Sequence, residues 1–273
     1  SVLMGRGDNE EAHYTLGNSF IMLIIIALIL TVFFRRFAEP LLMAFGASEN
    51  TIGYAMDYMR IYTLGTIFVQ FALGLNAFIT AQGFAKISMA TVVIGAIINI
   101  VLDPIFIFGF HMGVKGAALA TIISQAVSAI WVLRFLTGKK TILKLQKKYF
   151  RLRGSVVGPC LLLGMSPFIM QATESAISVC FNSSLYRYGS DIAVGAMSIL
   201  TSIMQFSMLP LQGFTQGAQP ITGYNFGAGN ADRVRQTFRL LLRYCLTYSL
   251  ILWAIYMAVP RLIPSMFTGD EQL

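Results

Sequence analysis

The sequence predicts an all-α, polytopic membrane protein with about seven transmembrane helices, drawn from an original twelve helices in two six-helix lobes. Composition is the first observation behind this prediction. Hydrophobic residues make up 56% of the 273 residues, charged residues make up 12%, and the mean hydropathy is +0.69, whereas soluble domains are about 45 to 50% apolar. The second observation is a series of long apolar windows, and the third is an internal repeat.

The apolar windows are each about 20 residues or longer, which is the length needed to cross the hydrocarbon core as a helix. They span residues 18–35, 54–79, 87–110, 116–136, 156–181, 192–221 and 238–259. If the first helix runs from inside to outside, fourteen of the twenty Lys and Arg residues fall on the inner side. Because cytoplasmic loops are enriched in Lys and Arg, we expect residues 138–155 to be cytoplasmic and the protein to lie in the plasma membrane.

The net charge of +8 and the pI near 9.5 also raise the question of nucleic-acid binding. The cations lie at the edges of the predicted spans, where the orientation rule accounts for them, so we expect no nucleic-acid partner. Cys160, Cys180 and Cys245 lie inside predicted spans without metal-ligand spacing, and we expect them to pack as small apolar residues.

The internal repeat has an offset of 222 residues and needs no gap. It places Gly5 on Gly227, Gly7 on Gly229 and the window 18–35 on the window 238–259. Both copies enter the membrane from the same side, so the halves are expected to have the same orientation. Extending the repeat in both directions predicts a protein of roughly 425 residues, of which this chain lacks the first two helices and the last three.

This arithmetic gives a domain organisation. We expect residues 1–137 to be the remainder of the N-terminal lobe (helices three to six), 138–155 to be a basic cytoplasmic linker, and 156–273 to be the start of the C-terminal lobe (helices seven to nine). The linker, which lies within the segment LTGKKTILKLQKKYFRLRGS, has two interpretations. A solvated segment that follows the orientation rule is favoured, and binding of anionic membrane lipid is the alternative.

A carboxylate inside the third window needs an explanation, because an aspartate near the centre of a membrane helix costs about 2.5 to 3.5 kcal/mol on insertion scales. Asp103 lies one helical turn from Asn99, on the same face, and Pro104 follows it. Proline lacks an N–H, so it frees the carbonyl of Ile100 and favours a kink there. Carboxylate, amide and carbonyl oxygens are hard ligands that suit a proton or Na⁺. The alternative is that Asp103 only ties helices together.

The next predicted helix supplies small residues and a hydroxyl. In GVKGAALATIISQ, glycine and alanine allow close approach to a neighbouring helix. Thr121 would then add its hydroxyl to the Asp103 site, although for this residue taken alone a threonine that bonds to its own helix backbone is the favoured interpretation.

Two further polar groups lie within predicted spans. Glu174 has Gln171 one turn away, and the two are candidates for a second proton or substrate site. Asp57 and Arg60 are three positions apart near the outer end of their window, and we expect them to form an interfacial pair. Met204, Phe206 and Met208 are weak candidates for the lining of an adaptable substrate cavity, since core packing explains them as well.

At this point the sequence resembles a known family, the multidrug and toxic compound extrusion (MATE) transporters. The resemblance is carried by the segments RIYTLGTIFVQFALGLNAFITAQG, NIVLDPIFIFGFHMGVKGAALATIISQ and MSILTSIMQFSMLPLQGFTQGAQPITGYNFGAG. Its most specific part is Asn99, three residues, Asp103 and Pro104, followed by the Gly-Val-Lys-Gly-Ala-Ala-Leu-Ala-Thr run that ends at Thr121. The resemblance extends over essentially the whole chain.

The resemblance implies twelve helices in two lobes and a secondary antiporter that is not an enzyme. It would expel small organic, often cationic, drugs in exchange for Na⁺ or H⁺, with no other cofactor. Asn99, Asp103 and Thr121 match the family's cation site, and Glu174 matches, more loosely, an acid on its seventh helix. No metal is implied beyond Na⁺ at Asp103. We expect the protein to act as a monomer.

Two other classes remain as alternatives. A flippase for lipid-linked precursors has the same broad architecture but is expected to have a cationic central cavity, and basic residues are almost absent from the predicted spans. An intramembrane aspartyl protease needs paired aspartates on neighbouring helices. Asp103 has no such intramembrane partner in this chain, because the other aspartate in the predicted windows, Asp57, lies near the outer end of its window.

Overall fold

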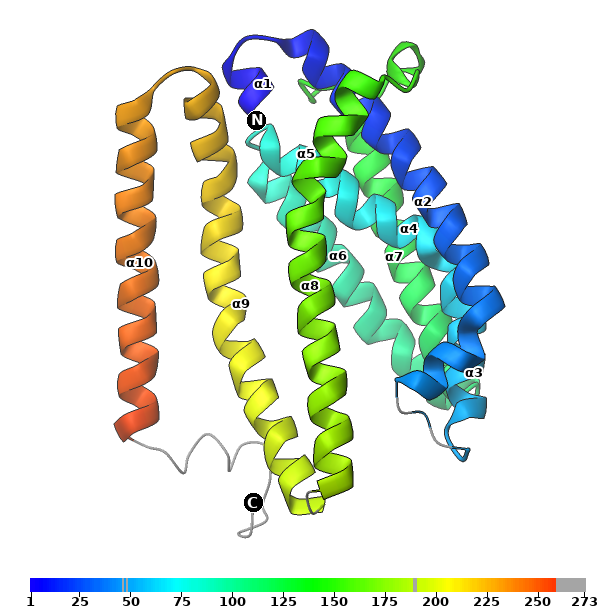
Figure 1. Ribbon diagram of the computed structural model, residues 1–273. Helices are drawn as coiled ribbons and strands as arrows, with labels where there is room; N and C mark the ends of the chain where they lie inside the picture. The colour runs from blue at the N-terminus through cyan, green and yellow to red at the C-terminus, as the bar shows by residue number, and fades with distance from the viewer. Residues whose placement is uncertain (46, 48, 189–190, 259–273) are drawn as a thin grey trace. The chain divides into compact units, whose positions relative to one another are not determined.

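The computed structural model describes residues 1–45, 47, 49–188 and 191–258, with the side chains of 44, 182, 183, 185–188, 191–196 and 198 left out. Over this part of the chain the regular structure is helical, with no β-strand, as predicted (Figure 1). The α-helices are α1 (Val2–Gly5), α2 (Asn9–Ala44), α3 (Ile52–Tyr62), α4 (Thr66–Gln70), α5 (Asn76–Ala81), α6 (Ala85–Pro104), α7 (Val114–Thr137), α8 (Gly154–Tyr188), α9 (Asp191–Gly227) and α10 (Ala231–Ala258). Short 3-10 turns are η1 (Thr63–Gly65) and η4 (Lys147–Tyr149), and π-helical turns are η2 (Phe71–Leu75) and η3 (Ile105–Gly109).

Six helical segments of the described chain are long and apolar enough to cross a membrane. They are Asn9–Met43, Ile52–Ala81, Ala85–Gly109, Val114–Thr137, Gly154–Phe181 and Ala231–Ala258. Each contains or overlaps one of the predicted windows. The remaining window, 192–221, is helical within α9, and its first residues lie outside the described side chains. Many large apolar side chains on these helices point outward, such as Ile29 at 61% and Leu163 at 79% exposed, as expected for a surface in contact with lipid.

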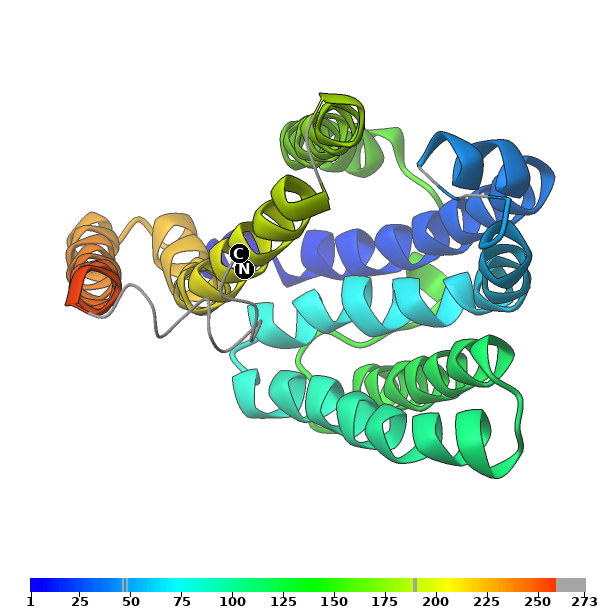
Figure 2. The same cartoon turned by 90° about the horizontal axis from the view of Figure 1, so that it is seen from below.

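The chain separates into two compact units. Unit 1 is essentially Gly7–Leu163, and unit 2 is Gly164–Leu273 together with Val2 and Met4–Arg6. Within unit 1 the segment from α3 to α5 lies between α2 and the antiparallel α6–α7 pair (Figure 2). Within unit 2 α9 packs against α10, where the Tyr248 hydroxyl donates to the Ser207 carbonyl at 3.2 Å.

Helix α2 begins and bends where its sequence requires it. Asp8 is the N-cap, and its side chain accepts a hydrogen bond from the Glu11 N–H at 3.1 Å, which satisfies one of the free donors of the first turn. The helix is interrupted at Phe37, where φ is −117° and ψ is 20°. Pro40 follows three residues later, and a proline inside a helix crowds the carbonyl of the preceding turn, which causes such a bend.

The internal repeat is confirmed by the backbone. Gly7 and Gly229, which the offset of 222 pairs, have φ of +79° and +75°, values that glycine adopts without steric cost. The turn that ends α1 has hydrogen bonds from Arg6 N to Val2 O (3.1 Å) and from Asp8 N to Leu3 O (3.0 Å). The turn that ends α9 has the matching bonds from Ala228 N to Tyr224 O (3.0 Å) and from Asn230 N to Asn225 O (2.9 Å).

The segment between α7 and α8, which we predicted to be a solvated linker, is partly buried. We call residues 138–153 the basic strap. Leu143 and Tyr149 of the strap are buried, at 3% and 6% exposed, and the strap belongs to unit 1. Its lysines and arginines are still largely exposed. The prediction of a solvated segment therefore holds for the basic side chains and is wrong for the apolar side chains between them, which pack against unit 1.

Candidate functional site

The Asn99–Asp103 pair forms as the spacing predicts. The Asn99 side-chain amide donates to a carboxylate oxygen of Asp103 at 3.2 Å, and both residues are half-buried in α6. They lie inside the membrane-spanning segment Ala85–Gly109. A hydrogen bond to the carboxylate offsets part of the cost of placing it in a membrane, and the remaining oxygen lone pairs stay available to a proton or a hard cation.

Pro104 changes the helix beside this carboxylate. The α-helical hydrogen bonding of α6 ends at Pro104, and the π-helical turn η3 follows directly. In η3 the Phe110 N–H donates to the Ile105 carbonyl at 2.9 Å, five residues back. The kink expected near Ile100 stays a prediction, and the structure shows a switch from α to π geometry directly after Pro104. Such π-turns occur frequently at functional sites.

Thr121 lies at the level of this pair on the neighbouring helix α7. A side chain at Gly95 would meet Ser124 and Ser128, and one at Gly116 would meet Phe106. These two contacts fix the antiparallel register of α6 and α7, and they place Thr121 opposite the turn that contains Asn99 and Asp103. The Thr121 hydroxyl itself donates to the Ala117 carbonyl of its own helix at 2.9 Å. No hydrogen bond between Thr121 and either partner is present among the described residues.

Gln171 and Glu174, the candidates for a second site, are hydrogen-bonded to each other within one helix. The Gln171 amide donates to a carboxylate oxygen of Glu174 at 3.3 Å on α8, and both side chains are exposed.

The predicted pair of Asp57 with Arg60 does not form. The Asp57 carboxylate lies 3.4 Å from the Lys115 ammonium of α7 instead of pairing with Arg60, because α3 packs against α7 and brings the start of α7 within reach.

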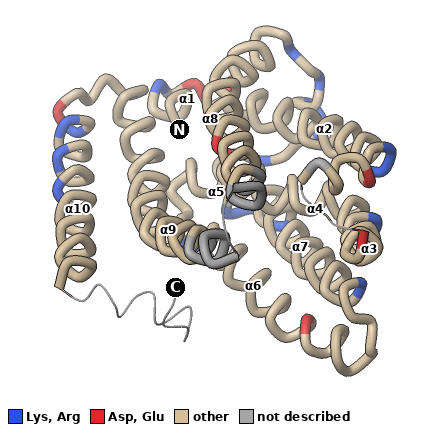
Figure 3. The backbone as a smooth tube through the Cα atoms, turned by 60° about the horizontal axis from the view of Figure 1, so that its bottom comes forward, with Lys and Arg blue, Asp and Glu red and all other residues tan. Residues whose placement is uncertain are grey.

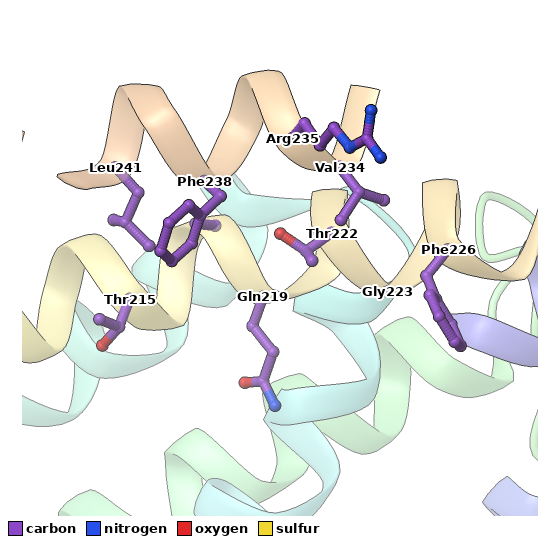
Figure 4. Close-up of a pocket in the computed structure, with 10 residues that line it drawn as sticks. Thr215, Gln219, Thr222, Gly223, Phe226, Val234, Arg235, Phe238 and Leu241 are labelled. Atoms are coloured by element: carbon purple, nitrogen blue, oxygen red, sulfur yellow. The ribbon is translucent and has the colours of Figure 1, made fainter. Parts of the chain in front are cut away.

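A groove of about 620 Å³ lies between α9 and α10 in unit 2 (Figure 4). Phe238 and Leu241 point from α10 toward α9 along it, and Gln219 and Thr222 are among the polar residues that line it from α9. Met204, Phe206 and Met208 are not among its lining residues, and they are 62%, 69% and 50% exposed. Their role in a substrate cavity stays a prediction.

The structure also shows a polar cluster between α5 and α6 that the sequence reasoning did not single out. Asn76 follows the π-turn η2, and its amide donates to the Ser88 carbonyl at 3.2 Å. The Thr80 hydroxyl donates to the Ser88 hydroxyl at 2.7 Å. The buried Oδ1 of Asn76 has no hydrogen-bond partner among the described residues, and unsatisfied buried acceptors are rare in proteins. The i, i+4 spacing of Asn76 and Thr80 in an apolar stretch is the signal that would have found this cluster.

Comparisons with known proteins agree with this architecture. Multidrug export protein MepA of Staphylococcus haemolyticus is 28% identical over 273 residues, which is 100% of this chain and 60% of the relative. A solved chain named protein A is 36% identical, with a TM-score of 0.91 over 99% of this chain and 61% of its own. A MOP superfamily transporter from Pyrococcus furiosus shares the fold, with a TM-score of 0.91 at 24% identity over 99% of this chain and 60% of its own.

Two facts follow from these matches. The chain spans about 60% of the length of the curated relatives it matches, in agreement with the expectation from the repeat arithmetic. The MatE family model matches residues 1–105 and again residues 167–273, as an internal repeat requires. With most of its length matched by that model, and with helices long and apolar enough for a multi-pass membrane protein, the chain belongs to the MatE family.

Proposed function

We propose that this protein is a multidrug exporter coupled to an inward cation gradient, with Asn99 and Asp103 at its cation site. The observation that carries the proposal is the 3.2 Å hydrogen bond between these two side chains inside a membrane-spanning helix, directly before the π-turn at Pro104. Support also comes from the curated relatives, which are named as multidrug export proteins. Intramembrane carboxylates mark ion and proton pathways in transporters.

The carboxylate of Asp103 would act as the switch. Binding of H⁺ or Na⁺ neutralises the carboxylate and weakens its hydrogen bond with the Asn99 amide. The charged and the neutralised states of the site therefore favour different packing of α6. The transition from α to π hydrogen bonding beside Asp103 is a place where the helix can change with little loss of hydrogen bonds. Release of the cation on the inner side then restores the charged site and the affinity for outgoing substrate.

The expected substrates are small organic cations and related drugs. A lipid-precursor flippase is not favoured, because a pyrophosphate group calls for cations inside the bundle. Lys86, Lys115 and Arg134 lie near the ends of their spans, and the two arginines nearest the middle of a described span, Arg239 and Arg243 of α10, have exposed side chains.

The test is uptake of a fluorescent organic cation into inverted membrane vesicles from cells that express the complete gene. Sodium and pH gradients are imposed separately, with vesicles from cells that lack the gene as the control. We expect accumulation that requires one of the two gradients and stops when an ionophore collapses it. Accumulation that needs neither gradient would refute cation coupling.

A further inference from the structure

The basic strap has a fixed backbone. The side-chain oxygen of Gln82, at the end of α5, accepts three hydrogen bonds from the strap: from the Thr141 hydroxyl (2.8 Å), the Ile142 N–H (2.9 Å) and the Leu143 N–H (2.8 Å). Gln82 is only 8% exposed. A buried acceptor with three donors on one loop holds that loop in one conformation.

A second buried amide holds the other end of the strap. Asn18 of α2 is 1% exposed. Its side-chain oxygen accepts from the Arg153 N–H at 2.7 Å, and its side-chain nitrogen donates to the Arg151 carbonyl at 3.3 Å. The two amides therefore hold the strap near its beginning and at its end.

Aromatic packing fills the space beneath the strap. Tyr149 stacks on His13 with ring centroids 5.1 Å apart, and Phe150 stacks on Phe20 at the same separation. A side chain at Gly17 would lie 2.4 Å from the Tyr149 carbonyl oxygen, so the strap runs directly over the backbone of α2. Nothing larger than glycine fits there.

This packing leaves the cations of the strap outside. The strap carries seven, namely Lys139, Lys140, Lys144, Lys147, Lys148, Arg151 and Arg153, and residues 104–173 contain no Asp or Glu. All but the half-buried Lys144 are exposed. Figure 3 shows the blue positions of this segment without red among them.

Among the described residues, no ion pair within 4.0 Å neutralises these charges. Lys115 with Asp57 is the only ion pair within 4.0 Å in the described part of the chain, so no strap cation has an acidic partner at that distance. Glu10 at the start of α2 is the acid that acts on Lys148, and a hydrogen bond with Tyr149 raises the pKa of Lys148. The Arg153 guanidinium lies 3.3 Å from the Tyr14 ring centroid.

The strap also lies at the membrane boundary. It connects two membrane-spanning helices, of which one ends at Thr137 and the other begins at Gly154, so each of its cations is at most about seven residues from the end of a span. The phosphate layer of the lipid headgroups occupies this depth.

From these observations we propose that the basic strap is a preformed binding surface for anionic phospholipid headgroups, held in place by Gln82 and Asn18. The basic side chains favour anionic over neutral headgroups, and the two buried amides keep these side chains in a fixed arrangement. This differs from a flexible polybasic loop, which attracts anionic lipid only through its net charge.

The test is native mass spectrometry of the purified protein with phosphatidylglycerol or with phosphatidylcholine of the same acyl chains. The strap variant carries Lys139→Gln, Lys140→Gln, Lys147→Gln and Lys148→Gln. Its matched control removes the same charge from α10, with Arg233→Gln, Arg235→Gln, Arg239→Gln and Arg243→Gln. We expect the strap variant to bind phosphatidylglycerol at least about tenfold more weakly, the control to bind within about twofold of the parent, and phosphatidylcholine binding to stay unchanged.

A second comparison tests the fixed arrangement. Gln82→Ala keeps every charge but removes the triple acceptor, and Gln146→Ala in the exposed part of the strap is its control. We expect Gln82→Ala, verified as folded by circular dichroism, to lose most of the preference for phosphatidylglycerol, whereas Gln146→Ala keeps it. Equal losses in the strap and α10 variants, or full binding by folded Gln82→Ala, would overturn the proposal. Displacement of the lipid by an RNA oligonucleotide at lower concentration than by phosphatidylglycerol itself would also overturn it.

Discussion

Gly5 and Gly227 are 222 residues apart, and each packs against the backbone of the helix that carries the other. A Cβ atom at Gly5 would lie 2.0 Å from the Tyr224 carbonyl oxygen, and one at Gly227 would lie 2.1 Å from the Val2 carbonyl oxygen. The offset of 222 maps Val2 onto Tyr224 as well as Gly5 onto Gly227. The contact is therefore symmetric, and the two copies of the repeat meet in it through equivalent residues.

This symmetry predicts equal effects of equal substitutions. Gly5→Ala and Gly227→Ala should each destabilise the protein by about 1 to 3 kcal/mol, because carbonyl oxygens of the facing backbone cannot move aside as a side chain can. The combined variant should cost less than the sum, since the first substitution already separates the helices. Thermal unfolding of the purified protein in detergent measures the change.

The matched control is Gly217→Ala in the same helix as Gly227, where, apart from the helix's own nearby backbone and the chain neighbours, no described atom lies within 4 Å of the Cβ position. There alanine should leave the stability unchanged or raise it by up to about 1 kcal/mol. A similar loss in Gly217→Ala and Gly227→Ala would contradict the symmetric contact.

Removal of the Asp103 charge should uncouple transport. Asp103→Asn keeps the shape and can still hydrogen-bond to Asn99, but it cannot be neutralised by a cation. We expect gradient-driven uptake into inverted vesicles to fall at least about tenfold with normal expression. Asp57→Asn, which removes the acid paired with Lys115, should keep most of the activity. The site assignment fails if Asp103→Asn transports at the rate of the parent.

Thr121 should contribute an oxygen ligand although its hydroxyl donates to its own helix, because a hydroxyl that donates one hydrogen bond still has lone pairs free. Thr121→Val should weaken Na⁺ binding about threefold to tenfold, as measured by a sodium titration of intrinsic fluorescence. Thr137→Val is the control, since Thr137 has the same kind of backbone bond, to the Leu133 carbonyl at 2.8 Å, at the far end of α7. Equal sodium affinity in the two variants would exclude Thr121 from the site.

The triple acceptor at Gln82 should be important for stability. Gln82→Ala leaves the Ile142 and Leu143 N–H groups without their partner, while the Thr141 hydroxyl keeps the Leu143 carbonyl at 2.9 Å as an acceptor. The substitution should cost about 2 to 4 kcal/mol in free energy of unfolding. Thr141→Val removes one of the three bonds and should cost about 1 kcal/mol, and exposed Gln146→Ala should cost under about 0.5 kcal/mol. Thermal melts in detergent rank the three variants. Any other order would show that the strap is held by other contacts.

The orientation predicted from the charges is tested with single cysteines in a background without Cys160, Cys180 and Cys245. Lys140→Cys lies in the strap beyond one end of α7, and Met112→Cys lies before its other end. A membrane-impermeant maleimide should label Met112→Cys in intact cells, and it should label Lys140→Cys only after the membrane is opened. The reverse pattern would invert the proposed direction of transport.

The sequence alone determined the elements that depend on local pattern. Apolar length predicted the membrane-spanning segments, and i, i+4 spacing predicted the Asn99–Asp103 pair. The offset of 222 paired Gly7 with Gly229, which the structure shows in matching conformations. Each of these follows from the geometry of a single helix or from the comparison of two aligned segments.

The tertiary structure alone decided which partners meet across helices. Asp57 pairs with Lys115 and not with its helix neighbour Arg60, and Gln82 and Asn18 hold a segment about 60 to 135 residues away. A lone Gln or Asn in an apolar sequence carries no sign of its partner, because the partner is chosen by how the helices pack. In a membrane that choice is decisive, since a buried amide has no water to replace a missing hydrogen bond.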